Sequence, residues 1–404
     1  MKNRDNRIHG RHLTSRLAGA LAAGMVAAAA FPGSALAGSP EFAYTQEKWA
    51  ALRDNVLDYG ELADLVHEYN PTVVNNRIAY DDYRGKDNDK YKNDYEDLVQ
   101  DLYDASDSAL DNVDDDQPGY AGALAASVTT RIQAERMQET ADAENTDGNI
   151  KKLEYDSQEA KLVQAAQMKM NQYWQKVKER RSLEAGLELA QAKHQSAAVR
   201  ASQGQETQAR VLEAQEAVET AQAAIQTADQ QISTLRSELC VMTGWSYDAI
   251  PEIGEIPAVR TVDIGAIDLA ADKQKALDQN LMLQAGVRRQ VNTNYGTAQR
   301  KALDVNVNEA RQKIQADVEN RYQLLRQAQS DQDQAAAQLA LEQQNAQAAK
   351  RKLDNGTIKR NEYLEAQSSL AMKEAAEQVS ALKLTQALED YQWAVGGLAD
   401  TGSL

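Results

Sequence analysis

Apolar residues recur at every seventh position in two long segments of the chain. In the first segment, branched apolar residues occupy one set of positions, and a set rich in alanine follows three positions later. The two sets are Val211, Val218, Ile225, Ile232 and Leu239, and Ala214, Ala221, Ala228, Leu235 and Met242. The second segment runs through Val318, Leu325, Gln332, Leu339, Ala346 and Leu353, with Ala328, Ala335 and Ala349 beside it. A seven-residue period predicts coiled-coil seams, and the small alanines predict closely packed helices.

The positions of proline and glycine set the lengths of the predicted helices. Proline is absent from 119–250 and from 258–404, so neither segment contains a residue that must break a helix. Turn-like clusters occur at 145–149, 203–205, 292–296 and 354–357. The pattern predicts helices over 150–202 and 205–243, about 80 and about 60 Å long. We therefore predict an all-α fold built from long antiparallel coiled-coil helical hairpins.

The chain carries an internal duplication. A shift of 152 positions (356 minus 204) aligns two turn glycines, two closing glycines and two Leu-Glu-Ala-Gln segments. The aligned landmarks are Gly204 with Gly356, Gly244 with Gly396, and 212–215 with 364–367. An opening landmark, Asn70-Pro71 in the first copy and Asn280-Leu281 in the second, is offset by 210 (280 minus 70). The first copy therefore contains an insertion, which is rich in tyrosine and aspartate.

The N-terminal composition and the duplication together divide the chain. Basic residues, an apolar run over 17–31 and Ala35-Leu36-Ala37 are typical of a cleaved secretory signal over 1–37. A membrane span is the competing interpretation, but this run is short and rich in Ala and Gly. We expect an exported protein whose further parts are a first helical repeat over 38–257 with its insertion at about 81–145, a second repeat over 258–398, and a tail over 399–404.

Composition and charge argue against several functional classes. The 404 residues are 42% hydrophobic but only 5% aromatic, which favours long helices over a large mixed core. The formal charge of −17 makes nucleic acid a poor partner. The single cysteine, Cys240, forms no intrachain disulfide, and a buried apolar role is expected for it.

Candidate catalytic and metal-binding residues are scarce. Beyond residue 37 the chain has two histidines, His67 and His194, and one cysteine. These residues are too few to predict a zinc site or a nucleophilic triad. Acidic runs at 87–89 and 111–116 lack the glycine and glutamate of an EF-hand loop, which favours a solvated acidic face. We predict no enzyme activity, no cofactor and no metal. Helix packing is the favoured role for Tyr80, Tyr83, Tyr91, Tyr95 and Tyr103, over a binding stripe.

The order of these landmarks resembles the TolC-like outer-membrane efflux family. The resemblance rests on the tandem repeats, Asn70-Pro71, the turn glycine eight residues before Leu-Glu-Ala-Gln, and closing segments at 239–244 and 393–397, and it covers most of 44–398. It implies an α-barrel protomer, a homotrimeric helical duct for export, and docking onto a periplasmic adaptor of an inner-membrane pump. By resemblance the docking residues are the hairpin tips, Ser202, Gln203, Gly204, Gln205, Asp354, Asn355, Gly356 and Thr357.

One element of that family is missing from the sequence. Members that cross an outer membrane insert a β-hairpin in each repeat, and a lipid-facing strand needs roughly 9 to 11 alternating residues. Residues 291–300 read as a polar turn, and 81–116 contain 14 acidic and 4 basic residues. Neither segment predicts strands, so membrane insertion is not expected from either of them.

Two functions from different classes remain open. The first is an export duct in the outer membrane or periplasm by resemblance, or at the cell surface where the cell has no outer membrane. The second is an extracytoplasmic structural coiled coil, such as an envelope spacer or surface interaction protein. A duct requires each hairpin to present one seam to its own partner and another to the neighbouring hairpin, whereas a spacer requires one seam. Alanine on more than one helix face favours the duct.

Overall fold

A computed structural model describes residues 39, 41–111, 113–258 and 264–404 of the chain. The predicted signal peptide, residues 1–37, lies outside the described residues. The helical elements are η1 (Glu41–Ala43), α1 (Gln46–Ala51), η2 (Tyr59–Glu61), α2 (Leu62–Tyr69), α3 (Pro71–Asp81), α4 (Asn88–Ser108), α5 (Tyr120–Ala143), α6 (Gly148–Ser202), α7 (Gln208–Met242), α9 (Leu269–Gln279), α10 (Leu281–Asn292), α11 (Ala298–Asp354), α12 (Arg360–Trp393) and the π-helical turn η3 (Ala394–Leu398). Two short strands, β1 (Val56–Leu57) and β2 (Glu252–Ile253), pair in parallel. The predicted all-α class is confirmed.

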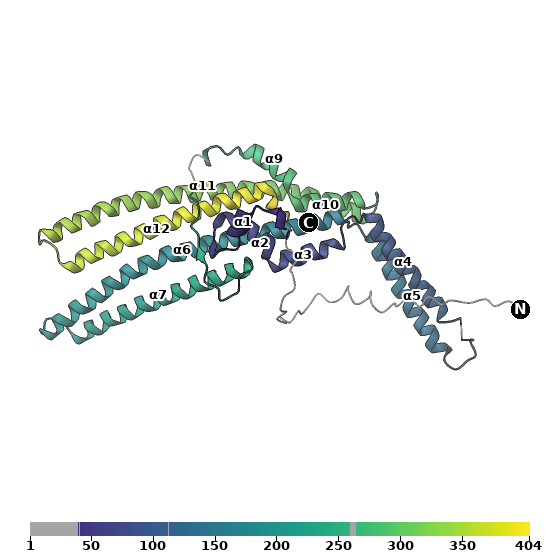
Figure 1. Cartoon of the computed structure of the whole chain (residues 1–404), viewed down its shortest axis with the longest axis horizontal. Helices are drawn as coiled ribbons and strands as arrows, with labels where there is room; N and C mark the ends of the chain where they lie inside the picture. Colours follow the sequence, from purple (N-terminus) through teal and green to yellow (C-terminus); the bar gives the residue numbers. More distant parts are fainter. Residues whose placement is uncertain (1–38, 40, 112, 259–263) are drawn as a thin grey trace. The chain divides into compact units, whose positions relative to one another are not determined.

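Four long helices lie side by side in the order α7, α6, α12, α11 (Figure 1). Helices α6 and α7 form one antiparallel hairpin, α11 and α12 form the other, and α6 packs against α12 between them. Both predicted seams are confirmed, because each of their positions is buried or half-buried in the described structure. The seams therefore close each hairpin on itself.

Capping side chains mark where the long helices begin. The carboxylate of Asp147 accepts a hydrogen bond from the Ile150 amide at the start of α6, at 2.9 Å. The hydroxyl of Thr297 accepts from the Arg300 amide at the start of α11, at 3.1 Å. Each cap satisfies a backbone donor that the first helical turn leaves unpaired.

The two opening asparagines are structurally equivalent. Asn70 and Asn280 are the buried N-caps of α3 and α10. Their side-chain oxygens accept hydrogen bonds from backbone amides in the first turn of each helix. Their side-chain amides donate to carbonyl oxygens near the end of the same repeat, Asn70 to Met242 at 2.9 Å and Asn280 to Ala399 at 2.8 Å. Each asparagine thus joins the beginning of its repeat to the end.

The predicted pairing of Gly244 with Gly396 is corrected by one residue. Gly244 has a φ of 82° and packs against Tyr69, while Gly397 has a φ of 120° and packs against Gln279. Tyr69 and Gln279 occupy equivalent places before the opening asparagines, so Gly397 is the counterpart of Gly244. The π-helical turn η3 accommodates one extra residue in the second copy, which a constant offset does not reveal.

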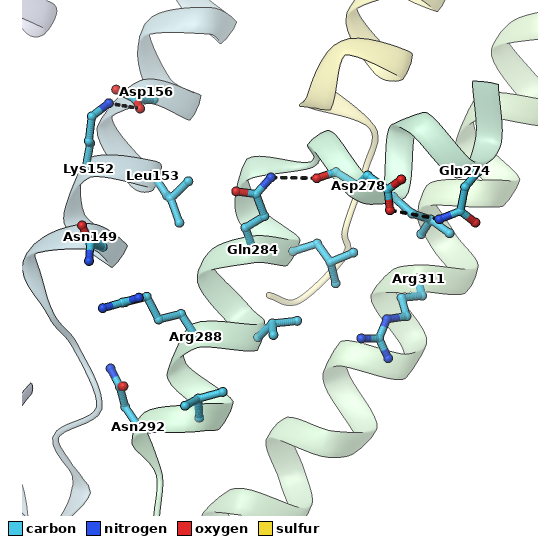
Figure 2. Close-up of a pocket in the computed structure, with 14 residues that line it drawn as sticks. Asn149, Lys152, Leu153, Asp156, Gln274, Asp278, Gln284, Arg288, Asn292 and Arg311 are labelled. Carbon is cyan, nitrogen blue, oxygen red and sulfur yellow. Dashed lines mark hydrogen bonds and ion pairs between the residues drawn. The ribbon is translucent and has the colours of Figure 1, made fainter. Parts of the chain in front are cut away.

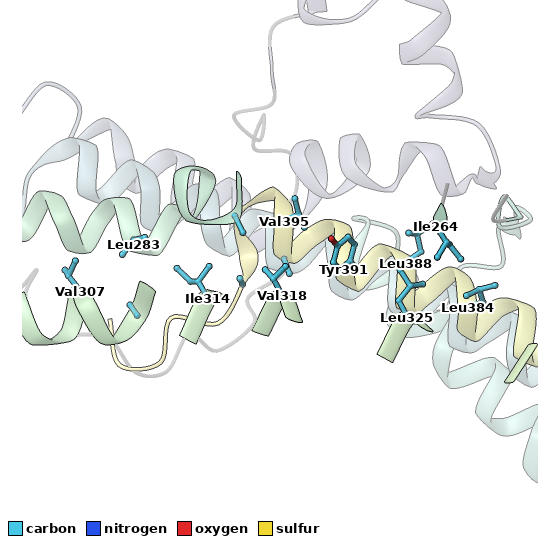
Figure 3. Packing of buried hydrophobic residues seen from close by; sticks show 14 residues of the cluster. Ile264, Leu283, Val307, Ile314, Val318, Leu325, Leu384, Leu388, Tyr391 and Val395 are labelled. Atoms are coloured by element: carbon cyan, nitrogen blue, oxygen red, sulfur yellow. The ribbon is translucent and has the colours of Figure 1, made fainter. Parts of the chain in front are cut away.

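Two apolar clusters hold the repeats together near their openings. One joins α2 and α3 to α6 and α7 around Leu57, Leu62, Met170 and Leu239. The other joins α9, α10, α11 and α12 around Ile314, Val318, Leu325 and Tyr391 (Figure 3). In both repeats the short helices cover the ends of the long helices that lie away from the tips.

The acidic insertion forms a helical hairpin. Helices α4 and α5 pack together, and a turn at 114–119 separates them. Buried Ser106 and Ser127 hydrogen bond across the seam, with their hydroxyl oxygens 2.9 Å apart. At the base of the hairpin Tyr83 stacks on Tyr91, with ring centroids 6.0 Å apart, in agreement with the predicted packing role. No strand occurs in the described residues of this segment, as the sequence predicted.

Candidate functional site

The two hairpin tips have the same backbone structure. At the first tip, Gly204 donates to the Ala201 carbonyl and Gln205 donates to the Arg200 carbonyl, at 3.0 and 2.9 Å. At the second tip, Gly356 and Thr357 make the matching bonds to Leu353 and Lys352, both at 2.8 Å. This pair of bonds is a Schellman motif, which ends a helix and reverses the chain.

The tip glycines are required by backbone conformation. Their φ angles are 73° and 68°, in the left-handed region that favours glycine. A Cβ at either position would meet no atom within 4 Å, so space does not restrict these positions. All eight predicted tip residues are exposed, namely Ser202, Gln203, Gly204, Gln205, Asp354, Asn355, Gly356 and Thr357. The structure brings them together as two exposed turns.

Polar contacts line the packing face between α6 and α12. Lys193 forms an ion pair with Glu365 at 2.7 Å, and the Gln164 amide donates to Asp390 at 3.0 Å. The buried Asn171 amide donates to the Leu382 carbonyl at 2.8 Å. The indole of Trp393 donates to Gln167 at 2.7 Å. These contacts fix the antiparallel register of the two central helices.

The equivalent faces of α7 and α11 are exposed. Leu364 on α12 is 5% exposed, whereas its counterpart Leu212 on α7 is 58% exposed. Leu189 on α6 is half-buried, whereas its counterpart Leu341 on α11 is 59% exposed. The duplication therefore leaves one unmatched face at each side of the four-helix layer. The sequence indicates more than one apolar helix face, but it does not identify Leu212 and Leu341 as unmatched, because heptad spacing alone does not encode packing partners.

The base of the α4–α5 hairpin is bound to the second repeat by a polar network. Asp147 is 1% exposed and accepts hydrogen bonds from Arg288 and Asn292 of α10. Burial alone would raise the pKa of this carboxyl, but the hydrogen bonds from Asn292, the Ile150 amide and Arg288 outweigh it and lower the pKa. Arg289 also forms an ion pair with Glu154 of α6. The network therefore fixes the start of α6, at the base of the insertion, to α10.

An open cavity of about 810 Å³ lies between α6, α9, α10 and α11 (Figure 2). Its charged side chains are bound to neighbouring protein groups. Lys152 pairs with Asp156 at 2.5 Å, and Asp278 accepts from the Gln274 amide at 2.9 Å. These pairings hold the side chains along the walls, and we assign no ligand to the cavity.

The remaining chemical candidates have structural contacts. Cys240 is buried, which raises the pKa of its thiol, and the thiol donates to the Ala249 carbonyl at 3.7 Å. His67 Nδ1 lies 2.7 Å from a Glu159 carboxylate oxygen, and this hydrogen bond raises the pKa of His67. Within the described ranges, no group of three or more acidic, histidine or cysteine side chains is arranged to hold a metal ion.

Comparison with known proteins identifies the fold. No family model matches the chain, and no curated protein matches it. The solved structure of the outer-membrane channel OprN matches with a TM-score of 0.56 at 12% identity, covering 88% of this chain and 93% of that one. A membrane protein from Pseudomonas aeruginosa matches with a TM-score of 0.54 at 13% identity, covering 84% and 93%. The CmeC outer-membrane channel of Campylobacter jejuni matches with a TM-score of 0.51 at 10% identity, covering 89% of each chain.

The chain therefore has the fold of a channel protomer built from duplicated helical hairpins. The TolC-like protomer fold predicted from the resemblance is confirmed. None of the helices in the described part of the chain is both long and apolar enough to cross a membrane.

Proposed function

We propose that this protein is one subunit of a TolC-like export duct outside the cytoplasm. The observation that carries the proposal is the pair of unmatched faces on α7 and α11. Because α7 is the duplicate of α12 and α11 is the duplicate of α6, the contact between α6 and α12 is a template for one between α11 and the α7 of another chain.

Two of the four polar contacts in the template have polar counterparts on the unmatched faces. The ion pair of Lys193 with Glu365 maps onto Asn345 and Glu213, an amide and a carboxylate that are able to hydrogen bond. Asn171, which donates to the carbonyl of residue 382, has Gln323 as its counterpart, and residue 382 corresponds to residue 230. A side-chain amide therefore remains available to donate to the backbone carbonyl of residue 230. Both contacts therefore remain possible between chains.

The other two template contacts are lost in the duplicate. Gln164 and Asp390 map onto Ala316 and Glu238, and the alanine has no side-chain donor. Glu238 instead pairs within its own hairpin, with Lys169 of α6 at 2.7 Å.

The contact of Trp393 with Gln167 maps onto Val241 and Glu319, which cannot hydrogen bond to each other through their side chains because valine has no polar atom there. Along both α7 and α11, the positions of the two retained contacts lie nearer the tips than those of the two lost contacts. We therefore expect the part of the contact between chains that lies toward the tips to follow the template most closely.

A head-to-tail contact of this kind closes into a ring when the rotation between chains permits. We propose a ring of three chains, a number taken from the family resemblance. In such a ring every long helix packs against two neighbours, and the third face of each helix lines a water-filled path. This arrangement supplies the second seam that distinguishes a duct from a spacer.

We further propose that the hairpin tips dock an adaptor of an inner-membrane pump. The eight tip residues are exposed, polar and presented by two turns of equal structure. The export of the chain by residues 1–37, and the division into repeats at 38–257 and 258–398, are parts of the same proposal. An envelope location follows from it.

Electron microscopy of the purified mature chain tests the duct. We expect hollow rings with three-fold symmetry in top views. Solid rods or unassembled single chains would instead favour the structural coiled coil, which is the alternative function.

Bulky substitutions at Gln203 or Asn355 test the docking of the tips. Both side chains are exposed, so we expect changes in stability below about 0.5 kcal/mol together with weaker export. Unchanged export with unchanged helicity would leave the tips as structural turns only.

A further inference from the structure

The second hairpin tip is strongly basic in an otherwise acidic chain. Residues 350–362 contain five basic and two acidic side chains, whereas the whole chain has a formal charge of −17. All five basic residues are exposed, and within the described residues none of them forms an ion pair with an acidic side chain. They are Lys350, Arg351, Lys352, Lys359 and Arg360, and we call them the basic tip.

The first tip lacks this charge although its backbone is the same. The equivalent positions hold Ala198, Val199, Arg200, Thr207 and Gln208. The one basic residue among them, Arg200, lies 3.9 Å from Glu206. The turn itself therefore does not require a basic surface.

The placement of Lys359 and Arg360 is unfavourable for the helix that they begin. The start of a helix carries a partial positive charge, so cations there are destabilising. Lys359 is the N-cap of α12 and makes no side-chain capping bond, while Thr207 caps α7 by accepting from the Arg210 amide at 3.4 Å. The two N-caps have nearly the same backbone angles, with φ of −84° and −87°. The helix that begins at the second tip thus lacks the favourable N-cap that the helix at the first tip has. Positions that depart from local stability in this way are typically functional.

We propose that the basic tip binds an acidic segment of a partner protein, and that the second hairpin therefore supplies most of the electrostatic part of docking. This inference rests on the proposed function and names the chemistry of the partner. A protein fits better than a membrane, because between 342 and 371 no large apolar side chain is exposed in the described structure.

A charge-reverting variant tests the inference. Lys359→Thr with Arg360→Gln gives these two positions the residues of the first tip, and a threonine at 359 can pair with Glu362 in a capping box. The control, Arg200→Gln with Arg210→Gln, removes the same charge from the first tip. The probe is a helical peptide of repeated Glu-Ala-Ala-Glu, titrated against the full mature chain at low and at physiological salt.

We expect the reverting variant to bind the peptide roughly tenfold more weakly at low salt. Its thermal midpoint should rise by roughly 1 to 3 °C, because the cap is restored. The control variant should keep its affinity. A structural role alone would not combine higher stability with weaker binding.

Three results would overturn the inference. One is unchanged peptide affinity in the reverting variant, and another is an equal loss in the control. The third is tighter binding to vesicles of phosphatidylglycerol and phosphatidylcholine than to the peptide, which would assign the tip to a membrane. If microscopy shows rings but the reverting variant keeps its affinity for the peptide, only the role of the basic tip is rejected. If the reverting variant alone loses affinity but no rings form, only the duct is rejected.

Discussion

Asp147 joins the start of α6, at the base of the insertion, to α10. It caps α6 and accepts hydrogen bonds from Asn292 and Arg288, which lie more than a hundred positions away in the sequence. The sequence places a turn at 145–149 but contains no local sign that this carboxylate meets α10. Long-range polar networks of this kind depend on the tertiary packing of helices, which periodicity does not report.

Replacing Asp147 with Asn should destabilise the protein by roughly 1 to 3 kcal/mol. Asn remains a good N-cap, so the lost stability measures the contribution of the ionised carboxylate and of its contacts with Asn292 and Arg288. The pKa of Asp147 is lowered from 3.8, so its stabilisation is fully present above pH 3.8 and is lost as pH falls through the folded-state pKa. Chemical denaturation at pH 7 and pH 3 measures the difference from the wild type.

The matched control is Asp142→Asn, an exposed carboxylate near the end of α5. It should change stability by less than about 0.5 kcal/mol at either pH. Equal effects of the two substitutions at pH 7 would show that the network around Asp147 does not stabilise the protein.

Among the elements, the long helices were predictable and the inserted hairpin was not. The predicted helix over 150–202 is α6 to within two residues, because its seam, caps and turn agree with one another. The bounds of α4 and α5 were not predicted, and in α4 the many acidic residues hide the apolar pattern. A weak signal is present in the seven-residue spacing of Ser127, Ala134 and Ala141, all of which are buried in α5.

Two neighbouring leucines on α11, one in the seam and one exposed, test which face of this helix forms the core. Leu325 is fully buried, so Leu325→Ala should cost about 2 to 5 kcal/mol in the free energy of unfolding. Leu324 is 52% exposed, and Leu324→Ala should cost much less. Thermal or denaturant unfolding of the two variants compares them. A larger cost at Leu324 would contradict the seam and place the core on another face.

At the scale of the whole molecule, the duplication was visible in the sequence, but its consequence was not. Matching Gly204 with Gly356 shows two copies of one hairpin. Only the structure shows that α6 of one copy packs on α12 of the other, leaving α7 and α11 at the two sides of the layer. The exposed Leu212 and Leu341 follow from that arrangement, because their counterparts Leu364 and Leu189 are covered.

The contact between chains is tested most directly by thiol crosslinking. In a Cys240→Ala background, Glu213→Cys and Asn345→Cys stand at the positions equivalent to the ion-paired Glu365 and Lys193. A positive control with Lys193→Cys and Glu365→Cys should crosslink within one chain. With a short bifunctional thiol reagent, the Glu213 and Asn345 pair should give covalent dimers and trimers and nothing larger on a denaturing gel. Monomers alone, with the control crosslinked, would contradict a duct closed through α7 and α11.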